Sequence, residues 1–284
     1  MKKYLPVLGI LLVFLLLFLL VAEFVEDETQ PKTDDTGNTQ IGEKGLYVGP
    51  ANWLRDNLSE EEKQSLIQAF TIQEQDIYTF LQGPKSWAEG LSWSGEWSQF
   101  QVDGNPFGGF GCGLCCLANI YNTLSPYEVS PWDLCEYAIE VSEYAPDGRY
   151  GAIDWEPMRD TLKNCGIRSK LYRKPKSYQK FQEQMRNARS AIVLICSGDD
   201  DTYWQDTPGH YVNIWLYQEE DDTVFLAEPG SPENNRSRVP LRYIYDALKS
   251  VSRFQYLLVK GYLEEDNQWK ADGIDEIWNN PKSL

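Results

Sequence analysis

The chain has 284 residues, of which 42% are hydrophobic and 13% aromatic, and this composition indicates a folded body with a sizeable core rather than a disordered chain. Its formal net charge of −17 argues against nucleic-acid binding, which needs clustered Lys and Arg, and against binding of anionic lipid by the soluble part. The ten tryptophans and seventeen tyrosines are explained first by packing, and second by a groove for an extended peptide or sugar.

The N-terminus carries an uncharged apolar run, residues 4–22, which follows Lys2 and Lys3 and precedes several acids. About 20 apolar residues are enough to cross a membrane as a helix, and this charge pattern predicts that the rest of the chain lies outside. Of the residues that end the run, only Ala22 is small, so we favour an uncleaved anchor over a cleaved signal for residues 1–25. The expected location is the cell membrane, single-pass, with an extracellular body, or secretion if the segment is cleaved.

Two segments precede the main body. Residues 26–48 are polar and acidic, which is typical of a flexible linker. Residues 49–86 are expected to be a helical extension, because Ser59 and Glu62 form a capping box and residues 72–83 place apolar side chains on one helical face. This extension either packs on the body or acts as a pro-segment that covers the site.

In the body, residues 87–284, helical patterns come first and strand patterns second. Helices are expected from Cys112, Ser130, Trp155 and Pro175. Strands are expected at 191–196, 210–217, 223–228 and 254–262. This order predicts an α+β fold in which a helical lobe packs on an antiparallel sheet.

The stretch GGFGCGLCCLANIY places Cys112, Cys115 and Cys116 within five positions. A phosphate loop is rejected, because no Lys-Ser/Thr follows the glycines and no apolar strand precedes them. A metal site is disfavoured because no second CxxC exists, so neither metal nor cofactor is expected. No obligatory disulfide framework is expected either, because a catalytic cysteine would leave five thiols. The thiols expected to be small buried core residues are Cys115, Cys116, Cys135, Cys165 and Cys196.

Cys112 is the best candidate for a nucleophile. It lies where a glycine loop enters a helix, and the N–H dipoles of a helix N-terminus favour the reactive thiolate. Such a thiol needs a base, and the single histidine, His210, opens an apolar strand. If the strands at 210–217 and 223–228 form a hairpin, Glu228 lies at the same end as His210 and can orient its ring.

Four sequence segments, in their order along the chain, resemble papain-like cysteine peptidases. They are GFGCGLCCLANIYNTL, GAIDWEPMRDTLKNCGI, GHYVNIWLY and FLAEPG. They are most similar to the double-glycine peptidases that process bacteriocin leaders and to their stand-alone extracellular relatives. The resemblance covers roughly residues 87–262. It implies a two-lobed papain-like fold with Cys112 as nucleophile and His210 as base. Glu228 stands where the family usually carries Asp or Asn before a proline, and an upstream glutamine that helps to hold the oxyanion is Gln99 or, preferably, Gln101.

The resulting hypothesis is a membrane-tethered extracellular cysteine peptidase whose partners are a peptide or protein substrate and, through the N-terminal helix, the membrane. Acyl transfer to an amine would use the same residues. One alternative is a catalytically silent surface module, suggested by Glu228 and by the aromatic residues of 87–110. Another is a cell-wall amide hydrolase, ranked lower because no wall-binding repeat is recognisable. The substrate and the oligomeric state stay open.

Overall fold

The computed structural model describes residues 72–146, 151–197, 204, 207–249 and 251–282. They belong to one compact unit, Ile72–Leu284. The predicted anchor (1–25), the predicted linker (26–48) and residues 49–71 of the predicted extension lie outside the described residues. Within the described part of the chain, no helix is both long enough and apolar enough to span a membrane.

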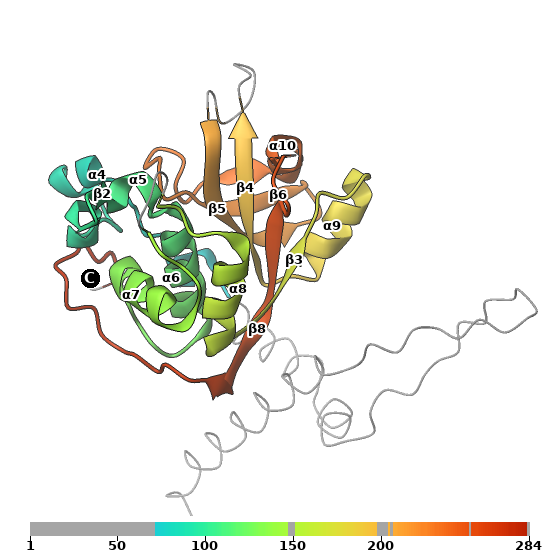
Figure 1. Ribbon diagram of the computed structural model, residues 1–284. Coiled ribbons are helices and arrows are strands. Elements are labelled where there is room, and N and C mark those ends of the chain that lie inside the picture. The colour runs from blue at the N-terminus through green and yellow to red at the C-terminus, as the bar shows by residue number, and fades with distance from the viewer. Residues whose placement is uncertain (1–71, 147–150, 198–203, 205–206, 250, 283–284) are drawn as a thin grey trace, which may run out of the picture. The chain divides into compact units, whose positions relative to one another are not determined.

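A six-stranded antiparallel sheet forms the centre of the unit, with the strand order β3-β8-β4-β5-β6-β7 (Figure 1). Its strands are β3 (Cys165–Tyr172), β4 (Ser190–Ser197), β5 (Thr207–Gln218), β6 (Thr223–Ala227), β7 (Arg238–Pro240) and β8 (Tyr256–Asn267). The four predicted strands correspond to β4, β5, β6 and β8. The predicted α+β class with an antiparallel sheet is therefore confirmed, whereas β3 and β7 were not expected.

Helices cover both faces of the sheet. On one side lie α6 (Cys112–Leu124), α7 (Pro131–Val141) and α8 (Trp155–Asn164), and on the other lie α9 (Tyr178–Arg186) and α10 (Leu241–Ala247) (Figure 1). Each set packs into its own hydrophobic cluster. The predicted helical lobe corresponds to the first set, and α10 was not expected.

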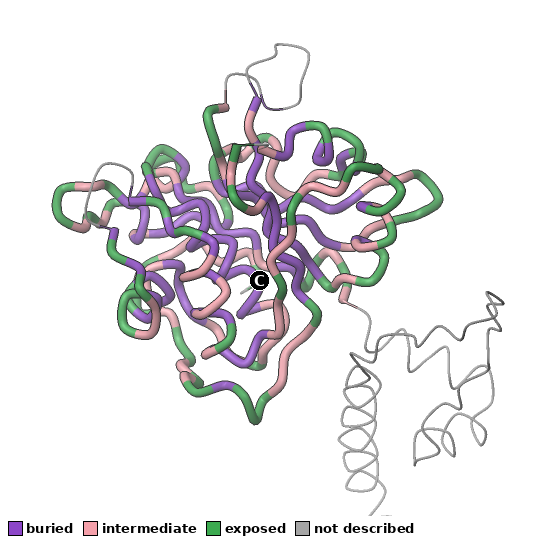
Figure 2. Tube along the Cα trace, turned by 45° about the vertical axis from the view of Figure 1, so that its right-hand side comes forward, coloured by how far each residue is buried: buried purple, intermediate pink, exposed green. Residues whose placement is uncertain are grey.

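The two-sided cover explains the uninterrupted apolar run of β4. Ile192 and Leu194 belong to the cluster with α6, α7 and α8, whereas Ala191, Val193 and Ile195 belong to the cluster with α9 and α10. Successive side chains of a strand point to opposite faces, so a strand buried on both faces has no polar alternation. Figure 2 shows this centre of the sheet as buried.

Residues 72–83 differ from their prediction. Instead of a helix, they form the short 3-10 helix η1 (Glu74–Asp76) and then an extended segment. Its N–H groups donate to distant acceptors: Phe80 N–H to Asn119 Oδ1 at 2.8 Å, and Leu81 N–H to Trp93 O at 2.9 Å. These tertiary partners replace the bonds of a helix, so residues 72–83 of the predicted 49–86 extension form a strap on the body.

Short elements fill the chain between this strap and α6. They are α4 (Pro84–Ala88), η2 (Glu96–Gln99), β1 (Gln101–Val102), β2 (Asn105–Pro106) and α5 (Phe107–Phe110). The aromatic side chains here are mostly core: Phe80, Trp93 and Trp97 are at most 4% exposed and pack with Trp278, with ring centroids 5.2 to 6.3 Å apart. Packing therefore accounts for this part of the aromatic load.

Candidate active site

Cys112 is the first residue of α6, as predicted, and is 8% exposed. The one-turn helix α5 precedes it, and Gly111 joins the two, accepting a hydrogen bond from Cys115 N–H at 2.9 Å. A Cβ on Gly111 would lie 2.3 Å from Cε1 of Phe107, so only glycine allows this close approach. The loop glycine thus packs the chain tightly just before the thiol.

The β5 and β6 strands bring the other two predicted residues together. They pair antiparallel with Asn213 opposite Ala227, so Glu228, which follows β6, lies at the end of β5 where His210 stands. Nε2 of His210 is hydrogen-bonded to Oε1 of Glu228, and the Cys112 side chain lies near enough to the same ring to contribute to its raised pKa. Since Nε2 faces the carboxylate, Nδ1 is the nitrogen left for the thiol.

The Glu228 carboxylate is only 1% exposed, and its hydrogen bonds are shared between both oxygens. Gly230 N–H donates to Oε1 at 2.9 Å, and Trp204 Nε1–H donates to Oε2 at 2.8 Å. The backbone N–H of Glu228 donates to Asn235 Oδ1 at 3.0 Å. Buried carboxylates need such donors, so the extra methylene of Glu relative to Asp is accommodated by a built pocket.

The environment of His210 favours the protonated ring. Burial works to lower the pKa of His210, but the negative charge of Glu228 and hydrogen bonds to Cys112 and Glu228 raise it from 6.5 to about 10. A ring with such a pKa is an imidazolium at neutral pH. It can then stabilise a thiolate beside it and donate a proton to a leaving group.

The loop after Glu228 packs on the imidazole, and the strand that carries it is anchored by an aromatic contact. A Cβ on Gly230 would lie 3.1 Å from both Cε1 and Nε2 of His210, so the loop backbone packs directly on the ring. Tyr211, the next residue of β5, meets Trp155 edge-on with ring centroids 5.0 Å apart. The Gly230 backbone therefore packs on the His210 ring, and the neighbouring Tyr211 fixes the start of β5 against Trp155.

The predicted glutamines lie elsewhere. Gln101 is exposed on the two-residue strand β1, and Gln99 is exposed at the end of η2. Among the described interactions, none joins either side chain to Cys112, His210 or Glu228. The structure brings together three of the four predicted site residues and leaves Gln101 at the surface.

A different glutamine, Gln82, lies beside the site. Its N–H donates to Pro229 O at 2.9 Å, and its side-chain Nε2–H donates to Gly108 O at 2.8 Å. It therefore bridges the loop after Glu228 and the turn before Cys112. Its Oε1 is buried without a partner among the described residues. Sequence reasoning missed it because residues 72–83 read as a helix; the Gly-Pro that follows was the available signal for an extended chain.

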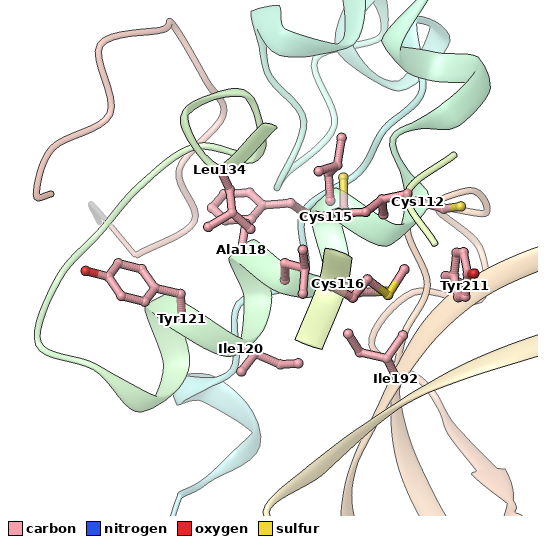
Figure 3. Packing of buried hydrophobic residues seen from close by; sticks show 14 of the residues in the cluster. Cys112, Cys115, Cys116, Ala118, Ile120, Tyr121, Leu134, Ile192 and Tyr211 are labelled. Atoms are coloured by element: carbon pink, nitrogen blue, oxygen red, sulfur yellow. The ribbon is translucent and has the colours of Figure 1, made fainter. Parts of the chain in front are cut away.

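The other cysteines surround the candidate nucleophile without duplicating it. Cys116 lies on the side of α6 that faces Tyr211 and Ile192 (Figure 3), and burial raises its pKa, as it does that of Cys115. All six cysteines are free thiols. Of the five expected in the core, Cys115, Cys116, Cys135 and Cys165 are buried, whereas Cys196 is partly exposed, contrary to its prediction. The described residues contain no group of three or more His, Cys, Asp or Glu placed to hold a metal ion.

Comparison with known proteins adds one distant likeness. No family model matches the chain. No curated protein matches it by sequence. Among solved structures it is similar to a Bacillus anthracis protein designated a C39-like peptidase, with 13% sequence identity, 54% of this chain and 90% of that chain covered, and a TM-score of 0.38.

Proposed function

We propose that the chain is a cysteine peptidase with Cys112 as nucleophile, His210 as proton carrier and Glu228 as the residue that orients the ring. The observation that carries the proposal is the buried His210–Glu228 hydrogen bond beside Cys112, whose side chain also acts on the imidazole. A thiol, an imidazole and an acid in this order constitute the apparatus of thiol acyl transfer. The membrane tether, the extracellular location and the kinship with double-glycine peptidases belong to the same proposal.

In this scheme Cys112 reacts as the thiolate, which the neighbouring imidazolium of His210 stabilises. The raised pKa of His210 means that the ring already holds the proton, so attack does not wait for the base to remove it. Cys112 Sγ attacks the carbonyl carbon of a peptide bond, and the carbonyl oxygen becomes an oxyanion. The imidazolium then donates its proton to the departing amine, and the acyl group stays on Cys112 as a thioester.

Two groups serve as donors to the oxyanion in this scheme. Cys112 begins α6, and the first N–H groups of a helix have no acceptor within it. Gln82 Nε2 lies at the turn that leads to Cys112, where it bonds Gly108 O. We assign to Gln82 the role that the sequence suggested for Gln101. Water then attacks the thioester with His210 as base and releases the acid; an amine in place of water would give acyl transfer.

The alternative of a catalytically silent binding module is no longer supported by the two features that suggested it. Glu228 is fully hydrogen-bonded rather than misplaced, and Trp93, Trp97, Phe107 and Phe110 are buried. A protein or peptide substrate is preferred over cell-wall amides.

Alkylation tests this proposal directly. Iodoacetamide at neutral pH should modify Cys112 of the full chain first, and His210→Ala should slow that modification by about 100-fold, because the thiolate loses its counter-ion. Peptide mass spectrometry reads out each thiol separately. Cys196, which is also partly accessible, is the internal control. Equal rates at Cys112 and Cys196, or no effect of His210→Ala, would overturn the proposal.

Incubation of the full chain with peptide libraries and with peptidoglycan fragments then tests the substrate class. Cleavage of peptides that Cys112→Ala abolishes supports the peptidase, whereas release of wall fragments alone would reassign the chain as an amide hydrolase.

A further inference from the structure

A basic hollow of about 620 Å³ lies at the C-terminal end of β3. Its lining includes Arg173, Lys174, Lys176, Tyr245, Arg253 and Gln255. The surrounding sequence is unusual for a chain of net charge −17, because residues 168–180 contain six Lys or Arg and no acid. The basic charge is thus concentrated where the surface is concave.

Acids near the hollow are already engaged. Glu156 is ion-paired with Arg253 at 2.8 Å, and Asp246 with Arg242 at 2.9 Å. Lys174 lies 4.5 Å from the centroid of the Tyr245 ring, which holds its ammonium in the hollow.

Two bases remain uncompensated. Arg173 and Lys176 are exposed, and within the described residues neither forms an ion pair. The hollow therefore presents two positively charged side chains that no acid of the described residues neutralises.

The hollow is connected to the candidate active site through two contacts. Ser252, on its wall, accepts a hydrogen bond from Trp155 Nε1–H at 3.0 Å. Trp155 in turn packs edge-on against Tyr211, the residue after His210. The hollow and the candidate active site lie at the same end of the sheet, because Gln255 O on its wall accepts a hydrogen bond from Leu194 N–H of β4 at 2.9 Å, and the next residue of β4, Ile195, pairs with His210.

We propose that the basic hollow binds acidic side chains of the peptide that Cys112 attacks, so that the chain selects substrates with an acidic segment outside the scissile bond. This inference rests on the proposed function for its choice of ligand. Arg pairs with carboxylates through two parallel hydrogen bonds, and Lys supplies a further charge. At physiological ionic strength the screening length is about 8 Å, so nearby bases dominate over the distant acids of the chain.

Binding can be measured without catalysis. The full chain carrying Cys112→Ala is titrated into a fluorescent peptide rich in glutamate, and into the same peptide with glutamine in place of glutamate, with anisotropy as the readout. We expect the glutamine peptide to bind about 10-fold more weakly, and Arg173→Glu with Lys176→Glu to cause a similar loss for the glutamate peptide. Lys85→Glu with Lys163→Glu makes the same charge change at other exposed lysines and should leave binding unchanged.

The outcomes separate this inference from the proposed function. Equal affinity for the two peptides, or equal losses in both double variants, would overturn the hollow as an acidic-peptide site. Tighter binding to inorganic phosphate or to phosphatidylglycerol vesicles, lost in the Arg173/Lys176 variant, would also overturn it in favour of a phosphate ligand. Selective alkylation of Cys112 is measured separately, and its failure would remove the peptidase while leaving the binding result intact.

Discussion

The residue that most shapes this site is Glu228, whose buried carboxylate accepts hydrogen bonds at both oxygens. Its two oxygens have separate tasks: Oε1 contacts His210 and Gly230, and Oε2 accepts from Trp204. A carboxylate held at both ends cannot swing away from the imidazole. Trp204 is therefore a positioning residue, acting on His210 through Glu228.

Trp204→Phe should lower the alkylation rate of Cys112 by about 10-fold, because a hydrogen bond to a buried charged group is lost. The pH profile of alkylation should shift as well, which a purely structural role would not cause. Trp215→Phe is the matched control, since Trp215 is also buried and its Nε1 has no partner among the described residues. Equal effects of both substitutions would show that Trp204 contributes packing alone.

Gln82→Ala should slow the acylation of Cys112 by p-nitrophenyl acetate about 100-fold while leaving its alkylation by iodoacetamide unchanged. Ester attack creates an oxyanion, whereas alkylation at a saturated carbon does not. Gln101→Ala serves as the control, because its side chain is exposed. A loss of acylation with Gln101→Ala instead would restore the residue that the sequence suggested.

At the scale of elements, α6 and β5 are joined by a buried amide pair. Asn119 Nδ2–H donates to Asn213 Oδ1 at 3.0 Å, and Asn119 Oδ1 accepts from Phe80 N–H of the strap. Asn119 lies about 10 Å along α6 from Cys112, and Asn213 lies about 10 Å along β5 from His210. The pair therefore sets the axial position of the thiol against the imidazole.

Asn119→Ala should lower the free energy of unfolding by about 2 kcal/mol, because Phe80 N–H is left buried without its acceptor. Alkylation of Cys112 should slow in parallel as α6 loses its register. Urea denaturation of the full chain measures the first effect. Asn187→Ala, which removes an exposed bond within α9, should change stability by less than about 0.5 kcal/mol. Identical unfolding curves for Asn119→Ala and wild type would contradict this role.

Across the whole molecule, the site couples folding to pH. The pKa of His210 is raised in the folded state, so its proton stabilises the fold fully below pH 6.5. That contribution is lost as the pH rises through about 10, because the folded protein then releases the proton that the unfolded chain has already lost. Only a fold that buries Cys112, His210 and Glu228 together produces this dependence.

The difference in unfolding free energy between wild type and His210→Ala should therefore shrink between pH 6.5 and pH 10. Denaturation of both full chains at several pH values tests this expectation. A constant difference over that window would mean that the ring is neutral in the folded protein.

The local signals in the sequence were sufficient to expect Cys112, His210 and Glu228 near one another, whereas their catalytic roles stay a proposal. Three local patterns carried this expectation: a glycine loop before a helical segment, a histidine at the start of a strand and an acid at the end of a strand. Each depends only on neighbouring residues along the chain. The hairpin of β5 and β6 follows from the same local pattern, and so does the buried strand β4. The predicted anchor and linker also rest on local composition alone, and they stay predictions.

Only the tertiary structure decided which glutamine approaches the site and what holds Glu228. Residues 72–83 have a helical apolar pattern, yet their N–H groups bond Asn119, Trp93 and Pro229, which lie far away in the sequence. Trp204 reaches Glu228 from the connection between β4 and β5. Such partners are selected by long-range packing, because a buried N–H or carboxylate takes whichever group the assembled fold places beside it.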